Sequence, residues 1–213
     1  MIQGGDPVRQ RRSWRDRLHT FFWGCGPRKV ITVVLLSRIF VFVVGVFAVL
    51  FLPKFRYYVT YGHSVLVDMW IRWDAGWYIT IAEHGYSYVP GQTTSVGWFP
   101  LYPLLLRLVH PLVDHAITGI IISNVALIVG MLILYRLLRL DVTKELSYRT
   151  ILYMVVFPAS LFFSSIHTES LFLLLSVAAF YCARKKHWAA AGLIGFLAAL
   201  TRATGILLFP ALV

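Results

Sequence analysis

Acidic residues are scarce in this 213-residue sequence, which has nine Asp and Glu against 20 Lys and Arg and a formal net charge of +11. Charged residues of both signs make up only 14% of the chain, whereas 59% of its residues are hydrophobic. Soluble domains carry more charge, so the composition indicates an integral membrane protein. The basic residues lie in short clusters between apolar runs. That pattern reflects membrane topology and argues against nucleic-acid binding.

The sequence lacks the patterns that are typical of several kinds of functional site. The two cysteines, Cys25 and Cys182, both lie near basic clusters, so no disulfide framework is expected. No phosphate-binding P-loop or glycine-rich dinucleotide fingerprint occurs, and no histidines have the close spacing of a zinc site. The histidines on the predicted outer side are scattered: His63, His84, His110, His115 and His167. We therefore predict no metal ligands and no firm cofactor, and dependence on a divalent ion stays open.

Long apolar runs predict an all-α fold, a polytopic bundle of transmembrane helices. The expected spans are 30–52, 117–138, 150–168, 169–183, 188–204 and a run that begins at 206. A span needs about 20 helical residues, so the last one is expected to be cut short and the chain to be part of a longer protein. The first run is too long for a cleavable signal peptide. Residues 1–29 are interpreted as a basic cytoplasmic segment and 30–213 as part of a membrane domain.

The distribution of Lys and Arg predicts which connections are cytoplasmic. Residues 1–29 contain seven of them, 136–149 contain four and 184–186 contain three. When these segments lie in the cytoplasm, every crossing obeys the positive-inside rule. The segments that face outward are then the loop at about 53–116, the turn at 167–169 and residues 201–205. Five of the nine acidic residues belong to this outer set: Asp68, Asp74, Glu83, Asp114 and Glu169.

The outer loop contains an aromatic stretch at 70–86. With the period of an α-helix, one face of this stretch carries four aromatic residues, Asp74 and Ile81. Gly85 is expected to end the helix. The four aromatic residues are Trp70, Trp73, Trp77 and Tyr78. Such a helix is expected to lie in the headgroup region, where Trp and Tyr are enriched. A second short interfacial helix is expected between Pro100 and His110.

Three charged residues stand out beside these patterns. Aromatic neighbours would partly exclude water from Asp74 and strengthen it as a base, although local pairing with Arg72 or capping of a turn are alternatives. Arg38 lies well inside the first span, where a charge either faces a partner in the protein interior or snorkels to the cytoplasmic surface. Glu169 and Arg202 are expected at the outer ends of neighbouring helices, either as an ion pair or as separate anchors.

Three groups of residues resemble one known family. The first group is Arg72-Trp73-Asp74-Ala75-x-Trp77-Tyr78-x-x-Ile81-Ala82-x-x-Gly85-Tyr86 with Phe99-Pro100-Leu101-Tyr102-Pro103. The others are Phe162-Phe163-Ser164 with Thr168-Glu169-Ser170-Leu171-Phe172, and Leu200-Thr201-Arg202-x-Thr204-Gly205. They are similar to the family that contains the second mannosyltransferase of GPI-anchor assembly, and prokaryotic relatives share the loop pattern. The resemblance runs from about residue 38 to the end, with departures at Trp98, His167 and Ala203.

The resemblance implies a membrane glycosyltransferase of the GT-C architecture. Such an enzyme takes a hexose, most often mannose, from a polyprenyl-phosphate donor of the dolichyl-phosphate type. It passes the sugar to a lipid or glycan acceptor on the non-cytoplasmic face and inverts the anomeric centre. The protein is then expected to be a multi-pass protein with a cytoplasmic N-terminus, in the plasma membrane of a prokaryote or the endoplasmic reticulum of a eukaryote.

An inverting transfer needs a base for the acceptor hydroxyl and a group that stabilises the leaving phosphate. Asp74 is the predicted base. Arg202 is the first choice for the phosphate and Arg72 the second, because the guanidinium fork matches phosphate oxygens. Further substrate-binding roles are predicted for Trp73, Trp77, Tyr78, His84, Tyr102 and Glu169.

Two other classes stay open from sequence alone. The chain is alternatively a non-catalytic polytopic membrane protein that keeps the loop as a structural element, or a lipid or small-molecule transporter. A transporter needs polar or interrupted helices near the bilayer midplane, and beyond Arg38 the predicted spans supply little of that. The expected partners are the lipid bilayer, the donor and the acceptor, with no nucleic acid.

Overall fold

The computed structural model describes residues 26–52, 64–110 and 112–212. Most of the predicted basic segment 1–29, Cys25 and loop residues 53–63 lie outside the described residues. Every regular element within the described ranges is a helix, as predicted. In chain order they are α2 (Pro27–Phe51), α3 (Val65–Asp68), α4 (Ala75–His84), α5 (Leu101–Val109), α6 (His115–Leu138), α7 (Lys144–Val156), the 3-10 helix η1 (Pro158–Phe163), α8 (Glu169–Arg184), α9 (Trp188–Ala199), the 3-10 helix η2 (Ala203–Leu207) and α10 (Leu208–Leu212).

Among the described helices, α2 and α6 have both the length and the apolar composition to cross a membrane, with 25 and 24 residues. α2 begins at Pro27, whose fixed φ suits a first helical turn. α6 is capped by Asp114, whose side chain accepts hydrogen bonds from the backbone N–H groups of Ala116 and Ile117. Most side chains of α2 point away from the bundle, and Phe40 is 69% exposed. An exposed apolar surface of this extent is typical of a helix in contact with lipid.

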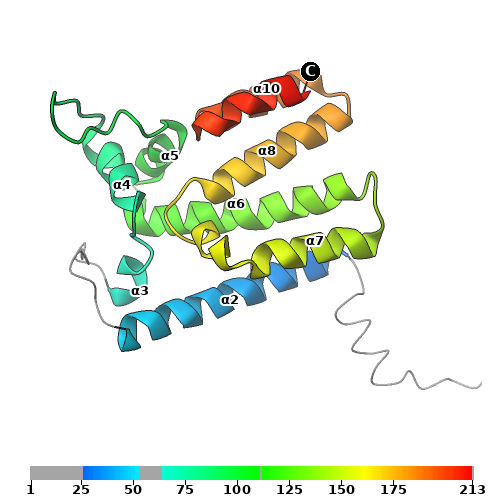
Figure 1. The fold of residues 1–213 in the computed structure, drawn as a ribbon, viewed down its shortest axis with the longest axis horizontal. Helices are drawn as coiled ribbons and strands as arrows, with labels where there is room; N and C mark the ends of the chain where they lie inside the picture. The colour runs from blue at the N-terminus through cyan, green and yellow to red at the C-terminus, as the bar shows by residue number, and fades with distance from the viewer. Residues whose placement is uncertain (1–25, 53–63, 111, 213) are drawn as a thin grey trace, which may run out of the picture.

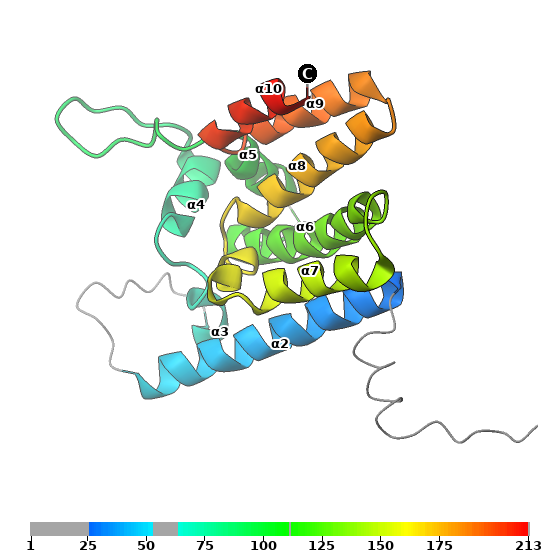
Figure 2. The ribbon, with the colours of Figure 1, turned by 45° about the vertical axis from the view of Figure 1, so that its right-hand side comes forward.

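The longer helices run side by side across the molecule (Figures 1 and 2). α6 packs against α2, α7 and α8, and α8 packs against α9. From α6 to α9 the helices alternate in direction, so their connections fall at two ends. We call the end that carries α3, α4 and α5 the loop end. The opposite end is the basic end, and its cations include Arg139, Lys144, Arg184, Lys185 and Lys186.

Arg38 connects the first helix to the α7–η1 segment. It is only 9% exposed, and its guanidinium donates to Ser160 O at 2.6 Å and to Val155 O at 3.2 Å. Two hydroxyls, Ser160 Oγ and Ser164 Oγ, accept further hydrogen bonds at 3.1 and 3.3 Å. The prediction of an interior partner is therefore confirmed, and the snorkelling alternative is wrong. Backbone carbonyl dipoles and hydroxyls balance the charge.

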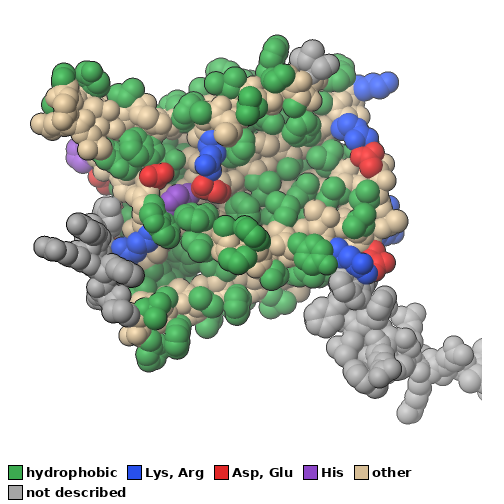
Figure 3. Space-filling view, in the orientation of Figure 1, with side chains coloured by type: hydrophobic (Ala, Val, Ile, Leu, Met, Phe, Trp, Pro, Cys, Tyr) green, Lys and Arg blue, Asp and Glu red, His purple; other side chains and the backbone are tan. Residues whose placement is uncertain are grey.

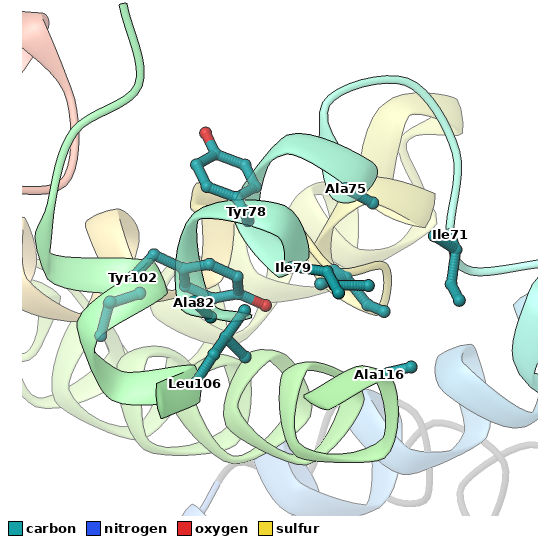
Figure 4. Packing of buried hydrophobic residues seen from close by; sticks show 10 residues of the cluster. Ile71, Ala75, Tyr78, Ile79, Ala82, Tyr102, Leu106 and Ala116 are labelled. Carbon is teal, nitrogen blue, oxygen red and sulfur yellow. The ribbon is translucent and has the colours of Figure 1, made fainter. Parts of the chain in front are cut away.

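The loop end has a hydrophobic core of its own. Side chains of α4 and α5 point toward one another above the first turns of α6 (Figure 4). Tyr102 is fully buried there, and its hydroxyl donates to Gly119 O at 3.1 Å. Gly119 itself has no room for a side chain, because a Cβ would lie 2.6 Å from Cγ2 of Ile166. The segment before α8 is thus packed directly onto α6.

Two predicted spans differ from the structure. The run 150–168 is not one helix: α7 starts at Lys144 and ends at Val156, and η1 follows. Pro158 explains the break, because proline disfavours helical backbone in the preceding residue, and Phe157 has ψ 135°. The run 188–204 ends early at Ala199. The chain then turns back on α9 so closely that a Cβ on Gly205 would lie 2.5 Å from Ala198 O.

The predicted aromatic helix is also shorter than expected. α4 begins only at Ala75, and Trp73 has the left-handed backbone angle φ 51°. Trp70 and Trp73 therefore do not belong to a helical face shared with Trp77 and Tyr78. The Trp73 ring, although 69% exposed, contacts the distant Phe162 with ring centroids 5.2 Å apart. The second short helix is confirmed as α5, and its location at the membrane interface stays a prediction.

Candidate active site

A pocket of about 400 Å³ opens at the loop end. It lies between the start of α4, the segment before α5, the turn that leads into α8, and η2. Figure 3 shows acidic, basic and histidine side chains gathered on this part of an otherwise largely hydrophobic face. The residues that line the pocket are Asp74, Tyr78, Gly97, Trp98, Phe99, His167, Thr168, Glu169, Thr201, Arg202, Ala203 and Thr204.

Asp74 reaches the pocket because of the turn that precedes α4. It is the N-cap residue of α4, but its side chain makes no capping hydrogen bond to the helix. The turn is closed by a hydrogen bond from Ala75 N to Arg72 O at 3.1 Å, and Trp73 adopts its left-handed conformation within it. The left-handed conformation costs a bulky residue about 1–2 kcal/mol of conformational free energy. The carboxylate is thereby left to face the pocket rather than the helix end.

Glu169 and Arg202 form an ion pair across the pocket wall. Arg202 Nη1 lies 2.6 Å from Glu169 Oε1, so the structure shows the ion pair, one of the two predicted alternatives. Glu169 is the first residue of α8, where the positive end of the helix dipole favours a carboxylate. Arg202 has extended backbone just before η2. Both side chains keep partial contact with solvent, at 28% and 40% exposure, so each is accessible to a ligand.

His167 is one of the pocket residues that the sequence patterns did not select. Its side chain is 5% exposed, and Nδ1 lies 2.9 Å from Ser165 Oγ. The ring meets Trp73 and Phe162 edge-on, at centroid distances of 6.3 and 5.3 Å. Burial lowers its pKa below the ordinary value for histidine, which keeps the imidazole neutral at neutral pH. The available signal was its position directly before Thr168 and Glu169.

Aromatic side chains form one side of the pocket. Tyr78 meets the buried Tyr102 edge-on at 5.2 Å, and burial raises the pKa of the Tyr78 phenol, which therefore stays protonated. Trp98 stacks on Trp77 with ring centroids 4.6 Å apart. Rigid, paired rings of this kind offer a flat surface of the type that carbohydrate rings pack against.

Four of the predicted site residues share this pocket: Asp74, Tyr78, Glu169 and Arg202. Trp77 and Tyr102 lie behind it and support Trp98 and Tyr78. Arg72 and Trp73 border a separate apolar groove. His84 lies at the end of α4, where it is largely exposed beside Glu83. Within the described ranges, no three His, Cys, Asp or Glu side chains are grouped to hold a metal ion.

Known proteins that are similar to this chain indicate its family. Residues 45–211 match the model of the family described as Mannosyltransferase (PIG-V). The chain is also 28% identical over 145 residues to GPI mannosyltransferase 2 of Cryptococcus neoformans var. neoformans serotype D, in each of two strains. The similarity covers 64% of this chain but 34% of those proteins, so the chain spans about a third of their length. No solved structure matches the chain. Because the family model covers well over half of the sequence, the chain belongs to the PIG-V mannosyltransferase family.

Proposed function

We propose that this protein transfers a hexose, in the first instance mannose, from a polyprenyl-phosphate donor to a lipid or glycan acceptor. The observation that carries the proposal is the convergence of Asp74, Glu169 and Arg202 in one pocket, although they are far apart in the sequence. Membership of a mannosyltransferase family supports the reaction class. The activity is proposed for the protein at its full natural length.

The proposed reaction is a single displacement with inversion. The acceptor hydroxyl gives its proton to the carboxylate of Asp74 as its oxygen bonds to the anomeric carbon. The bond from that carbon to the phosphate oxygen breaks, and its electron pair leaves with the polyprenyl phosphate. Arg202 stabilises the charge that develops on the phosphate. General-base assistance of this kind typically contributes about 10²–10⁴-fold to the rate.

The remaining pocket residues orient the substrates in this proposal. Glu169 holds Arg202 through the 2.6 Å ion pair. Tyr78 and Trp98 form the platform for the sugar, with Trp77 and Tyr102 as supports. Neutral His167 accepts or donates one hydrogen bond through Nε2, which has no partner among the described residues. His84 contacts only a part of the substrate that extends past the pocket.

The proposal orients the loop end toward the non-cytoplasmic side. The basis is the charge at the opposite end, where five basic residues lie in the connections after α6 and α8 or at the helix ends beside them. The positive-inside rule requires such an excess of a cytoplasmic face. The N-terminus is then cytoplasmic. The membrane is the plasma membrane in a prokaryote or the endoplasmic reticulum in a eukaryote, and a polyprenyl-linked donor reaches the pocket within the bilayer plane.

The test is hexose transfer from radiolabelled polyprenyl-phosphate mannose into membrane extracts that contain the full-length protein. We expect Asp74→Asn to lower transfer by about 10²-fold or more. The matched control is Glu83→Gln, which neutralises another acidic residue of the same loop that does not line the pocket. Transfer by Asp74→Asn at the wild-type rate would move the base elsewhere. Absence of transfer with any hexose donor would favour the non-catalytic protein or the transporter.

A further inference from the structure

His167 lies at the floor of the candidate pocket. It is one of the residues that line the pocket, although only 5% of its surface is exposed. Its ring meets the rings of Trp73 and Phe162 edge-on, and its Nδ1 is hydrogen-bonded to the hydroxyl of Ser165. These contacts restrict rotation of the imidazole, so each of its two nitrogens has a defined direction.

Two linked hydrogen bonds fix the tautomer of His167. The Ser165 hydroxyl has one hydrogen, and it donates that hydrogen to Phe162 O at 3.1 Å. In its 2.9 Å contact with Nδ1 of His167, the Ser165 oxygen therefore accepts, and the hydrogen of this contact belongs to the imidazole. A neutral imidazole carries a single N–H, so Nε2 has a lone pair and no hydrogen. Nε2 is consequently a hydrogen-bond acceptor.

This acceptor has no hydrogen-bond partner among the residues that the structure describes. Nε2 points away from Ser165, because the two nitrogens of an imidazole ring face in different directions. A neighbouring polar side chain of the pocket, Thr201, is satisfied within the protein, since its hydroxyl donates to Ala198 O at 2.6 Å. Buried polar groups are nearly always hydrogen-bonded. We therefore expect Nε2 to find its partner in the molecule that enters the pocket.

The partner of Nε2 has to be a hydrogen-bond donor. A sugar hydroxyl can donate, whereas the oxygens of an ionised phosphate only accept and are repelled by the lone pair of Nε2. The phosphate is thus directed to Arg202, and the floor at His167 is left to the sugar. The rings of Tyr78 and Trp98, the proposed sugar platform, line the same pocket. Because Asp74 takes the proton of the attacking hydroxyl in the proposed reaction, the hydroxyl at His167 is a different, non-reacting one.

We infer that His167 is a specificity-determining residue, whose Nε2 accepts a hydrogen bond from one non-reacting hydroxyl of the transferred hexose. The inference rests on the proposed function for the identity of the ligand. It narrows the donor from any hexose to hexoses that carry a hydroxyl at this one ring position. A site built to hydrogen-bond a substrate hydroxyl rejects the analogue that lacks it, because the buried partner is then left unpaired.

The test is equilibrium binding of radiolabelled polyprenyl-phosphate mannose and its monodeoxy analogues to the full-length protein in nanodiscs. Two amide variants separate the two ring nitrogens. His167→Asn retains an amide N–H near the position of Nδ1, where it can donate to Ser165, but has no atom at the position of Nε2. His167→Gln is longer by one methylene and can place its carbonyl oxygen, an acceptor, at the position of Nε2.

The wild-type protein should bind one of the monodeoxy analogues about tenfold more weakly than the mannose donor, as expected for the loss of one hydrogen bond. His167→Asn should bind that analogue and the mannose donor equally, because its affinity for mannose has fallen by about the same factor. His167→Gln should keep most of the preference. The matched control is His187→Asn, which changes an exposed histidine at the basic end and should leave every affinity unchanged.

Three results would overturn the inference. The first is a wild-type protein that binds all the analogues as tightly as the mannose donor, or binds none of them. The second is a preference that persists in His167→Asn. The third is an equal weakening of all ligands in both amide variants, which would indicate a purely structural role. Binding requires no sugar transfer, so the transfer assay tests the proposed function separately: transfer without the preference would remove the role of His167 alone.

Discussion

Arg202 and Glu169 lie 33 positions apart in the sequence, yet Nη1 of the first is 2.6 Å from Oε1 of the second. The pair joins the N-terminus of α8 to the backbone just before η2. It therefore closes the wall of the pocket that faces Asp74. A second pair, between Arg184 and Asp141, has similar geometry at the basic end, with two contacts of 2.7 Å.

These two pairs provide a matched comparison. Arg202→Ala should lower the transfer rate constant by about 10²–10³-fold, the usual cost of removing one group that stabilises transition-state charge. Arg184→Ala removes an equally close pair but lies at the opposite end, so transfer should stay near the wild-type rate. Radiolabelled hexose transfer, normalised to protein in the membrane, measures both. An unchanged rate for Arg202→Ala would remove it from the proposed mechanism.

Arg38 should be essential for stability. Arg38→Leu removes the guanidinium that donates to the carbonyls of Val155 and Ser160, although Val155 O keeps the hydrogen bond from the Ser160 hydroxyl. A buried hydrogen bond to a charged group contributes about 1.5–3 kcal/mol. We expect the midpoint of thermal unfolding in detergent to fall by about 5 °C or more. Arg28→Leu is the control on the same helix, because the Arg28 side chain is exposed, and its effect should be small. Equal midpoints for the two variants would contradict this account of Arg38.

His167 should make the protein less stable in mild acid. Burial lowers its pKa in the folded state, so below the ordinary pKa of about 6.5 the unfolded chain binds a proton more readily than the folded one. Stability is therefore fully present above pH 6.5 and is lost as the pH falls, by at most about 1.4 kcal/mol per pH unit. His167→Gln removes this contribution. Unfolding midpoints between pH 7 and 5 should fall less in the variant, and parallel curves would exclude His167 as the cause.

The proposed topology can be tested by thiol labelling. Cys25 and Cys182 are the only cysteines, so their replacement by Ser gives a background free of thiols. In that background, Thr93→Cys in the exposed loop before α5 should react with a membrane-impermeant maleimide from the non-cytoplasmic side. Lys186→Cys should react only after the membrane is permeabilised. Labelling of both cysteines from the same side would contradict the proposed topology, in which positions 93 and 186 lie on opposite sides of the membrane.

Sequence alone predicted the helical class because apolar runs and clusters of Lys and Arg are local properties. The positive-inside rule also predicted that Glu169 and Arg202 lie at the outer ends of neighbouring helices. The structure shows them there as an ion pair. Helical periodicity failed at Trp73, which has a left-handed backbone angle and a ring that contacts Phe162 and His167. No local pattern reports a contact between residues that are so distant in the chain.

The sequence also gave no reason to separate Arg72 from Arg202. Both are cations at the predicted outer side, and either can bind a phosphate. Only the packed structure assigns one to the apolar groove and the other to the polar pocket. His167 was missed for a related reason, since its ring also contacts Trp73 from the outer loop, about 90 positions earlier in the chain.

The left-handed turn at Trp73 has a consequence for the order in which the protein is made. The Trp73 ring in this turn contacts Phe162, which is synthesised about 90 positions later, and Ile166 N donates to Trp70 O across a similar separation. The loop with Asp74 thus leaves the ribosome well before its packing partners. The conformation of this loop is completed only after the start of α8 has been synthesised and has packed against it. Formation of the pocket is consequently a late event of assembly, and truncation before residue 170 should leave Asp74 without a defined position.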